Sequence, residues 1–245
     1  MYAYINYTDI TARKEVEKLQ GKLENASIQA AAKADFYSQM SHDMRTPMNI
    51  ILGLADIALK ENDVTELHQD IEKIIDSGKY MLNLINDTLD LQRIEGNRLK
   101  LEPQVVKCSN ILNDIIAMIT PSVKEKNLTL QVNILEHTEM DWFIRVDVLR
   151  LKQIITNILS NAIKYTPTGG TIALRIGELS RDGLISHALI EILDTGVGMS
   201  REFLKNGIFK PFSQERNEMT MMYAGSGLGL SIVKKLVEMM VAEST

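Results

Sequence analysis

The chain has 245 residues, a length that predicts one large domain or two modest ones at about 150 residues per domain. Hydrophobic residues make up 45% of it and charged residues 24%, which is typical of a globular protein and excludes collagen-like and wholly disordered classes. Aromatic residues reach only 5%, which favours helix over an aromatic-rich β-sandwich. The net charge of −5, without any block of like charges, makes nucleic acid a poor candidate for a partner.

Cysteine usage and hydropathy predict a reducing location. The single cysteine, Cys108, cannot form an intrachain disulfide, and residues 1–14 lack the pattern of a secretory signal. No stretch approaches the ~18 uncharged apolar residues that cross a bilayer. We therefore expect a cytoplasmic segment without membrane contact of its own; attachment of a longer protein through an upstream segment stays open.

The first part of the chain has the pattern of two long helices. From Asp9 to Ala34 a coiled-coil seam is predicted, and the helical period then continues through Pro47, where we expect a kink, to Ala58. The seam consists of Val16, Leu19, Leu23, Ala26 and Ala30. After a break at residues 61–63, a second amphipathic helix is predicted from Val64 to about Glu95. A hairpin of two such helices leaves an apolar face uncovered, which predicts a dimeric four-helix bundle.

After Pro103 the pattern changes to that of an α+β domain. We predict helices over Ile111–Ile119 and Val148–Lys164, and the remaining segments alternate as strands do. These strands are predicted near residues 128–132, 171–176 and 188–193. The domain boundary is expected near residues 97–104.

Polar residues gather on one face of the predicted helix Val148–Lys164. Gln153, Asn157, Asn161 and Lys164 follow one another at spacings of three or four, while isoleucines and leucines occupy the other face. Asparagine is a mediocre helix former, so two on one face suggest a ligand. A solvated helix surface is the alternative interpretation of this segment alone.

Two glycine motifs follow. Asp194-Thr-Gly-Val-Gly-Met comes directly after an apolar strand pattern, and by itself could be an ordinary Asp-Gly turn. Gly225-Ser-Gly-Leu-Gly-Leu opens a helix, whose free N–H groups favour an anion. Residues 200–224 between the motifs are predicted to form a mobile loop with two hydrophobic anchors, Phe209 and Phe212.

Four features follow one another along the chain: the asparagine helix, Asp-x-Gly-x-Gly, the paired Phe and Gly-x-Gly-x-Gly. In this order they resemble the N, G1, F and G2 boxes of the ATP-binding domain of sensor histidine kinases. The resemblance implies an α/β-sandwich fold of the gyrase, chaperone and histidine kinase superfamily, with Asp194 at the adenine amino group and Asn161 at Mg²⁺ and the phosphates. The other nucleotide-binding residues that it implies are Asn157, Lys164, Tyr165, Gly196, Gly198, Phe212, Gly225, Gly227, Leu228 and Gly229.

A second resemblance lies in the first helix. The segment from Phe36 to Asn49, FYSQMSHDMRTPMN, is similar to the H box of the same family, which makes His42 the phosphoacceptor. By the ~100° step of a helix, His42 points away from its methionine neighbours two residues to either side, towards solvent. The neighbouring Asp43 can stabilise a proton on the other ring nitrogen. Family resemblance also links the pattern from Asp43 to Thr46 with dephosphorylation of a partner.

Several alternatives accompany this interpretation. Pro47 could be a surface kink without function, and the remaining histidines, His68, His137 and His187, have no comparable context and are expected to be inert. A hydrolytic relative of the gyrase or chaperone type would carry a Glu where this chain has Asn157, which offers no base. From a different class, a catalytically impaired nucleotide-binding or scaffold dimer stays open.

The combined expectation is the core of a two-component sensor histidine kinase that is a homodimer, uses ATP and Mg²⁺ and transfers a phosphoryl group to a response-regulator receiver domain. The predicted domains are residues 1–34 as signalling helix, 35–98 as dimerisation and phosphotransfer domain, and 103–245 as catalytic domain. Residues from Tyr2 to Lys14 resemble the last strand and exit of a PAS sensor domain. Compared with the family pattern, the catalytic domain is expected to lack its last strands.

Overall fold

The computed structural model describes residues 11–61, 63–96, 98–135, 143–182, 185–215 and 225–243. The chain divides into two compact units, Met1–Met81 and Leu82–Thr245. The sequence suggests the last strand of a PAS domain from Tyr2 onward. Residues 1–10 of this segment lie outside the described residues.

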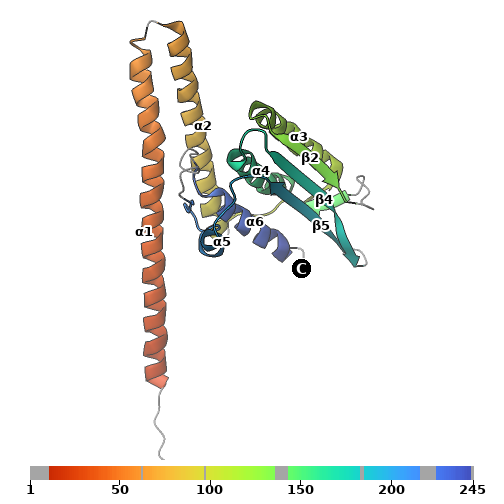
Figure 1. Cartoon of the computed structure of the whole chain (residues 1–245). Coiled ribbons are helices and arrows are strands. Elements are labelled where there is room, and N and C mark those ends of the chain that lie inside the picture. Colours follow the sequence, from red (N-terminus) through yellow and green to blue (C-terminus); the bar gives the residue numbers. More distant parts are fainter. Residues whose placement is uncertain are drawn as a thin grey trace, which may run out of the picture. The chain divides into compact units, whose positions relative to one another are not determined.

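The first unit is a helical hairpin (Figure 1). Helix α1 covers Thr11–Ala58 and helix α2 covers Val64–Glu95, so both predicted helices are confirmed, and α2 continues into the second unit. In the single chain, Leu19 and Leu23 of the expected coiled-coil seam are 60% and 74% exposed. That is the exposure of a seam position when no second helix covers it. The side chains of the other three seam residues, Val16, Ala26 and Ala30, lie outside the described part.

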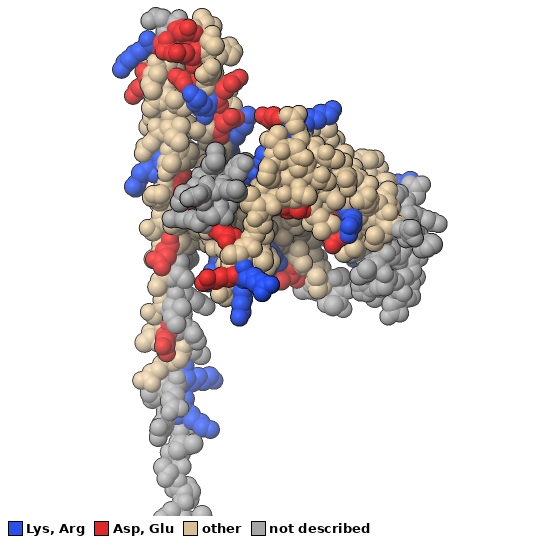
Figure 2. All heavy atoms as spheres, in the orientation of Figure 1, with Lys and Arg blue, Asp and Glu red and all other residues tan. Residues whose placement is uncertain are grey.

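Asp63 determines where α2 begins. Its carboxylate Oδ1 accepts hydrogen bonds from the backbone N–H of Thr65 at 2.7 Å and of Glu66 at 3.3 Å. These N–H groups have no partner inside the helix, and the bonds lower the pKa of the Asp63 carboxyl. Glu61 accepts from the Asp63 N–H at 2.8 Å. Figure 2 shows acidic side chains gathered at this turn of the hairpin.

Besides the end of α2, the described part of the second unit contains two small sheets, three long helices and one short helix. In chain order its elements are β1 Gln104–Lys107, α3 Cys108–Glu125, β2 Thr129–Ile134, β3 Phe143–Val146, α4 Val148–Tyr165, β4 Thr171–Asp182, β5 Ile185–Asp194, α5 Arg201–Asn206 and α6 Gly229–Glu243. Strands β1 and β3 pair antiparallel. The other sheet has the order β2-β4-β5, with β2 parallel and β5 antiparallel to β4.

The predicted helices and strands of the α+β domain are confirmed, with three differences. Strands β4 and β5 extend into a longer hairpin than the alternating pattern indicated. Strands β1 and β3 were not predicted, because four-residue strands are too short to show a period. The segment 200–224, expected to be a loop throughout, contains α5, whose first turn is capped by Ser200 accepting from the Phe203 N–H at 3.2 Å.

Alternation along β4 builds the core of the second unit. Ile172, Leu174 and Ile176 are buried on one face of the strand, and helices α3 and α4 pack on that face. The helices contribute buried residues at helical spacing: Ile111, Leu112, Ile115, Ile119 and Val123 from α3, and Ile155, Leu159 and Ala162 from α4. Helix α6 packs against α4 in turn. The core thus fixes which face of α4 points inward.

Replacing Leu159 by Ala tests this core. Leu159 is fully buried, so L159A is expected to lower the free energy of unfolding of the second unit by about 2–5 kcal/mol. The measurement is urea unfolding followed by circular dichroism. On the same helix Leu149 is 68% exposed, so L149A should stay within about 0.5 kcal/mol of the wild type. Equal losses in both variants would contradict the assignment of the buried face.

Replacing Asp63 by Ala tests the helix cap. Since the cap lowers the pKa of Asp63 in the folded state, its stabilisation is present at pH values above the pKa of the unfolded chain, about 4, and is lost as the pH falls through the lower folded-state pKa. D63A should therefore lower the thermal stability of the hairpin at pH 7, and the difference from the wild type should shrink towards pH 2. A pH-independent difference would indicate another role for Asp63.

Candidate active site

His42 lies on an exposed face of α1, as the helical period predicted. Its side chain is 73% exposed, and its Nδ1 lies 3.2 Å from Oδ1 of Asp43. The Asp43 side chain is only 19% exposed, and its Oδ1 also accepts a hydrogen bond from Gln39 Nε2 at 3.2 Å. The carboxylate is therefore held in place by the preceding helical turn, and it engages one ring nitrogen of His42 while the ring stays accessible.

One turn after His42, the helix continues through a proline. Thr46 donates from its hydroxyl to the His42 carbonyl at 3.4 Å, and Pro47 is buried within α1. A proline has no N–H, so Pro47 cannot donate to the carbonyl of Asp43, four residues earlier. The kink expected at Pro47 stays a prediction.

Helix α4 carries the polar face that the sequence singled out, and both of its ends are fixed. At its start, Asp147 is buried and accepts from the backbone N–H of Arg150 at 3.0 Å and of Glu102 at 2.9 Å. At its end, the Lys126 ammonium donates to the carbonyls of Ile163 at 2.8 Å and Lys164 at 2.7 Å. The Lys126 ammonium thus places a positive charge at the negative end of the helix dipole. Lys126 had no sequence signal, because its partners lie 37 and 38 residues away.

The polar face of α4 meets both glycine motifs. A Cβ atom on Gly225 would lie 2.6 Å from Lys164 Nζ, and one on Gly229 would lie 3.5 Å from Asn157 Oδ1. At the end of the helix, a Cβ on Gly196 would lie 2.8 Å from the Tyr165 carbonyl oxygen. The structure therefore brings together residues that the sequence places about 30 to 70 positions apart, and backbone rather than side chains approaches α4.

Asn157 supplies an unpaired polar atom. Its amide Nδ2 is buried, and no hydrogen-bond partner for it lies in the described part of the chain. A buried donor without a partner costs free energy, and such groups usually mark a ligand or water site. Lys164 Nζ lies 4.8 Å from the ring centroid of Tyr165, so the positive charge is held over the aromatic face beside the same helix.

Asp194 lies at the end of β5 in an Asx turn. Its Oδ1 accepts from the Gly196 N–H at 2.8 Å, and the side chain is exposed. The Val197 N–H donates to the Tyr165 carbonyl at 3.3 Å, which ties this turn to the end of α4. Gly198 has a φ of 68°, a conformation that glycine adopts readily.

The glycine loop before α6 packs against Phe212. Gly227 has a φ of 67°, and a Cβ atom there would lie 2.8 Å from the carbonyl carbon of Phe212, which itself has a φ of 57°. Leu228 is fully buried, and Gln214 donates to the Gly225 carbonyl. The other predicted anchor, Phe209, is 46% exposed, with Lys234 Nζ 5.5 Å from its ring centroid.

Residues of α2 that the sequence did not single out also reach this region. Asp87 accepts a hydrogen bond from Ser226 in the glycine loop at 3.3 Å, and Asp90 pairs with Arg150 of α4 at 3.1 Å. All four residues belong to the second unit. Their partners are 139 and 60 residues distant in sequence, so no local pattern could reveal them.

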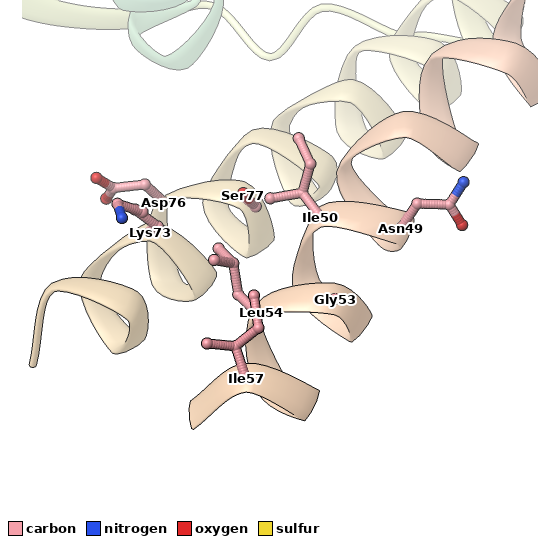
Figure 3. A pocket seen from close by; sticks show the side chains of 8 residues that line it. All are labelled: Asn49, Ile50, Gly53, Leu54, Ile57, Lys73, Asp76 and Ser77. Carbon is pink, nitrogen blue, oxygen red and sulfur yellow. The ribbon is translucent and has the colours of Figure 1, made fainter. Parts of the chain in front are cut away.

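A separate groove of about 600 Å³ runs between α1 and α2 within the first unit (Figure 3). Ile50, Leu54 and Ile57 extend from α1 into the space between the helices. Its other lining residues are Asn49, Gly53, Lys73, Asp76 and Ser77. The residues that line this groove include no cluster of catalytic side chains.

Within the described ranges, no group of three or more His, Cys, Asp and Glu side chains could hold a metal ion. A magnesium ion at a nucleotide site needs few protein ligands, because the phosphates and waters supply the others. Among the helices of the described part, none combines the length and the apolar character of a membrane span.

Two family models match the chain. Residues 32–97 match the His Kinase A phosphoacceptor domain, and residues 146–244 match the ATPase family of histidine kinases, DNA gyrase B and HSP90. The autoinducer 2 sensor kinase/phosphatase LuxQ of Vibrio vulnificus strain YJ016 is 35% identical over 241 residues, which are 96% of this chain and 27% of LuxQ. The chain thus spans about a quarter of the length of this relative.

Solved structures have a similar fold. Full-length ShkA in complex with AMPPNP superposes with a TM-score of 0.55 at 26% identity, over 82% of this chain and 40% of ShkA. The histidine kinase ThkA in complex with the response regulator TrrA gives a TM-score of 0.55 at 22% identity, over 95% of this chain and 61% of ThkA. The predicted fold class, a helical hairpin followed by an α/β ATPase domain, is confirmed.

Replacing Gly227 by Ala tests the construction of the glycine loop. A Cβ atom there would meet the backbone of Phe212, and its φ is unfavourable for alanine, so G227A should weaken binding of a non-hydrolysable ATP analogue about tenfold or more. Isothermal titration calorimetry measures this. Gly78 in the middle of α2 has open space around it, so G78A should bind as the wild type does. Unchanged binding by G227A would show that the nucleotide does not use this loop.

Proposed function

We propose that this chain, which belongs to the protein histidine kinases, catalyses the MgATP-dependent phosphorylation of His42 and passes the phosphoryl group to an aspartate of a response-regulator receiver domain. The observation that carries the proposal is the contact between His42 Nδ1 and the Asp43 carboxylate at 3.2 Å on an exposed helix face. It holds one ring nitrogen and leaves the other available as a nucleophile.

The reaction at His42 follows from that contact. With the proton on Nδ1, the ring donates to Asp43, and Nε2 keeps its lone pair. Nε2 attacks the γ-phosphorus of ATP, a P–N bond forms, and the bond to the bridging oxygen breaks, so that ADP leaves with the electron pair. The ring gains positive charge during attack, and the Asp43 carboxylate stabilises it. Asp43 is thus proposed to raise the nucleophilicity of His42 without accepting the phosphoryl group.

The nucleotide site is proposed on the polar face of α4 and the two glycine motifs. Asp194 accepts from the adenine amino group, with Gly196 and Gly198 allowing the base to approach the backbone. Asn161 binds Mg²⁺, and the buried, unpaired Nδ2 of Asn157 fits a site that an anionic ligand completes. Mg²⁺, when bound, neutralises charge on the transferring phosphoryl group.

The remaining residues of the site surround the phosphates. Gly225, Gly227 and Gly229 are proposed to present backbone N–H groups at the start of α6, where the helix dipole favours anions, and the Leu228 N–H, which donates to Ser226 Oγ at 3.2 Å in this structure, is proposed to join them when that bond opens. Lys164 and Tyr165 line the end of α4, and the backbone of Phe212 supports the loop at Gly227. These roles extend the resemblance to the family's boxes.

Thr46 is proposed to take part in the reverse signalling step, dephosphorylation of the regulator. Its hydroxyl lies on the exposed surface one turn after His42 and donates to the His42 carbonyl at the long distance of 3.4 Å. A weak bond of this kind is easily exchanged for one to a water nucleophile. The similar protein LuxQ carries the name kinase/phosphatase.

The whole protein is proposed to act as a homodimer through the hairpin, with MgATP as substrate complex and a receiver domain as partner. The similar protein ThkA forms a complex with such a partner, the response regulator TrrA. The proposed domains are residues 1–34 as PAS exit and signalling helix, 35–98 as phosphotransfer domain and 103–245 as catalytic domain. A coiled coil that runs unbroken into the segment around His42 is suited to transmit rotation or bending.

Incubation with γ-labelled MgATP tests the proposal. The wild type should acquire a label that is labile in acid and stable in alkali, and His42→Gln should abolish it because the nucleophile is gone. His68→Gln changes another exposed histidine of the hairpin and should leave labelling unchanged. Asp43→Ala should slow labelling about 10²-fold. Label that persists in His42→Gln would refute the assignment, and a wild type that binds nucleotide without labelling would favour the impaired scaffold dimer.

A further inference from the structure

The C-terminal part of α2 carries a row of three acidic side chains, each paired with a different segment of the second unit. Asp87 accepts from Ser226 in the glycine loop at 3.3 Å, and Glu95 pairs with Lys235 of α6 at 2.9 Å. Between them, Asp90 contacts α4. Asp87 and Asp90 are three residues apart and lie on one face of the helix, and Glu95 follows five residues later, so this end of α2 contacts all three segments.

The middle contact is more enclosed than the one at Glu95, whose Lys235 and Glu95 side chains are 32% and 54% exposed. Asp90 Oδ2 accepts from Arg150 Nη1 at 3.1 Å and from Gln153 Nε2 at 2.8 Å, and Arg150 Nη1 also lies 2.8 Å from Gln153 Oε1. The Arg150 and Asp90 side chains are 14% and 17% exposed. An enclosed ion pair with mutual hydrogen bonds is held more firmly than a surface pair. It anchors α2 to the same face of α4 that carries Asn157 one turn later.

The outer contact at Asp87 reaches the phosphate-binding part of the site. Ser226 donates from Oγ to Asp87 Oδ2, and its Oγ also accepts from the Leu228 N–H at 3.2 Å. A Leu228 N–H that is used in this way is not directed to a ligand. Ser226 lies between Gly225 and Gly227, so a single hydrogen bond joins α2 to the middle of the glycine loop.

The charge of Asp87 opposes the ligand that the loop is proposed to bind. A carboxylate beside the start of α6 repels a triphosphate, and in this partly buried position the repulsion is weakly screened. Burial raises the pKa of the Asp87 carboxyl, its hydrogen bond from Ser226 lowers it, and the neighbouring Asp90 raises it.

We propose that Asp87 is a positioning residue that holds the glycine loop, through Ser226, in a conformation that competes with ATP, while Asp90 and Glu95 keep α2 in register for this contact. Tight nucleotide binding requires that Ser226 leave Asp87, so the position of α2 sets the affinity for the triphosphate. This inference rests on the proposed nucleotide site and adds a restraint to it. The restraint weakens binding of the phosphates and leaves binding of the adenine at Asp194 unchanged.

The test compares nucleotide affinities of single variants by isothermal titration calorimetry with Mg²⁺ and AMPPNP. Asp87→Ala removes the charge and the acceptor, so it should tighten AMPPNP binding about fivefold or more. Asp87→Asn keeps an acceptor but not the charge and should tighten it to a smaller degree. The matched control is Asp76→Asn, an exposed acid of the same helix paired with Lys79, which should bind as the wild type does. Adenosine, which has no phosphates, should bind all four proteins equally.

A double variant shows whether Asp87 acts through Ser226. In the Asp87→Ala background, Ser226→Ala should change AMPPNP affinity less than it does in the wild type, since the bond between the two side chains is already absent and only the bond from the Leu228 N–H is still lost. Thermal melting of every variant verifies folding, and the contrast between AMPPNP and adenosine is a readout that general loosening would not produce.

Two results would overturn the inference. One is AMPPNP affinity in both Asp87 variants that equals or falls below that of the wild type. The other is an equal gain for adenosine, which would show that the contact does not act on the phosphates. A wild type that binds neither AMPPNP nor adenosine would instead defeat the proposed nucleotide site itself, so the two failures are distinguishable.

Discussion

The rotational setting of helix α4 is the constraint on which the second unit depends. Ile155, Leu159 and Ala162 are buried against α3 and β4, so Asn157 is turned towards the start of α6, where a Cβ atom on Gly229 would lie 3.5 Å from its Oδ1. The cap at Asp147 and the Lys126 ammonium fix the two ends of the helix. A rotation of α4 by one residue would move Leu159 out of the core and turn Asn157 away from the start of α6, which couples the geometry of the site directly to the stability of the core.

Around this fixed helix, backbone forms much of the site's wall. Gly225 gives room to the Lys164 ammonium, Gly227 adopts a left-handed φ against Phe212, and Gly229 lies beside Asn157. The steric reason is strict at Gly227, weaker at Gly225, where the lysine side chain could shift, and absent at Gly229, where a Cβ atom would make an ordinary contact. A wall of backbone offers N–H groups at fixed positions and little side-chain entropy to lose on binding, which suits a ligand recognised by its phosphates.

The parts of this structure that follow from local periodicity could be predicted from the sequence. The long helices α1 and α2, the polar face of α4 and the exposed position of His42 beside Asp43 all depend on spacings of about one to four residues. Strands β1 and β3 escaped prediction because four residues hold no period.

Pairings across long sequence separation could not be predicted either. Two examples are the contact of Lys126 with the end of α4 and that of Asp87 with Ser226. The residues involved are common polar types, and they come into contact only in the completed fold. The glycine motifs were recognisable, yet the reason for each glycine, such as the approach of Phe212 to Gly227, became visible only in three dimensions. Roles inferred for the individual site residues rest on resemblance, and the geometry supplies the distances by which they can be tested.

Pro47 gives the mechanics of α1 an asymmetry. Because it has no N–H, the backbone hydrogen bond from residue 47 to the Asp43 carbonyl is missing. The helix is therefore more compliant between Asp43 and Pro47 than in the turns on either side. The carbonyl that lacks this hydrogen bond is that of Asp43, whose carboxylate contacts His42. A torque applied to the N-terminal end of α1 would therefore deform the helix first at the level of Asp43 and Pro47. A small deformation at this level would change the alignment of the His42 imidazole and the Asp43 carboxylate before it changed the part of α1 that follows.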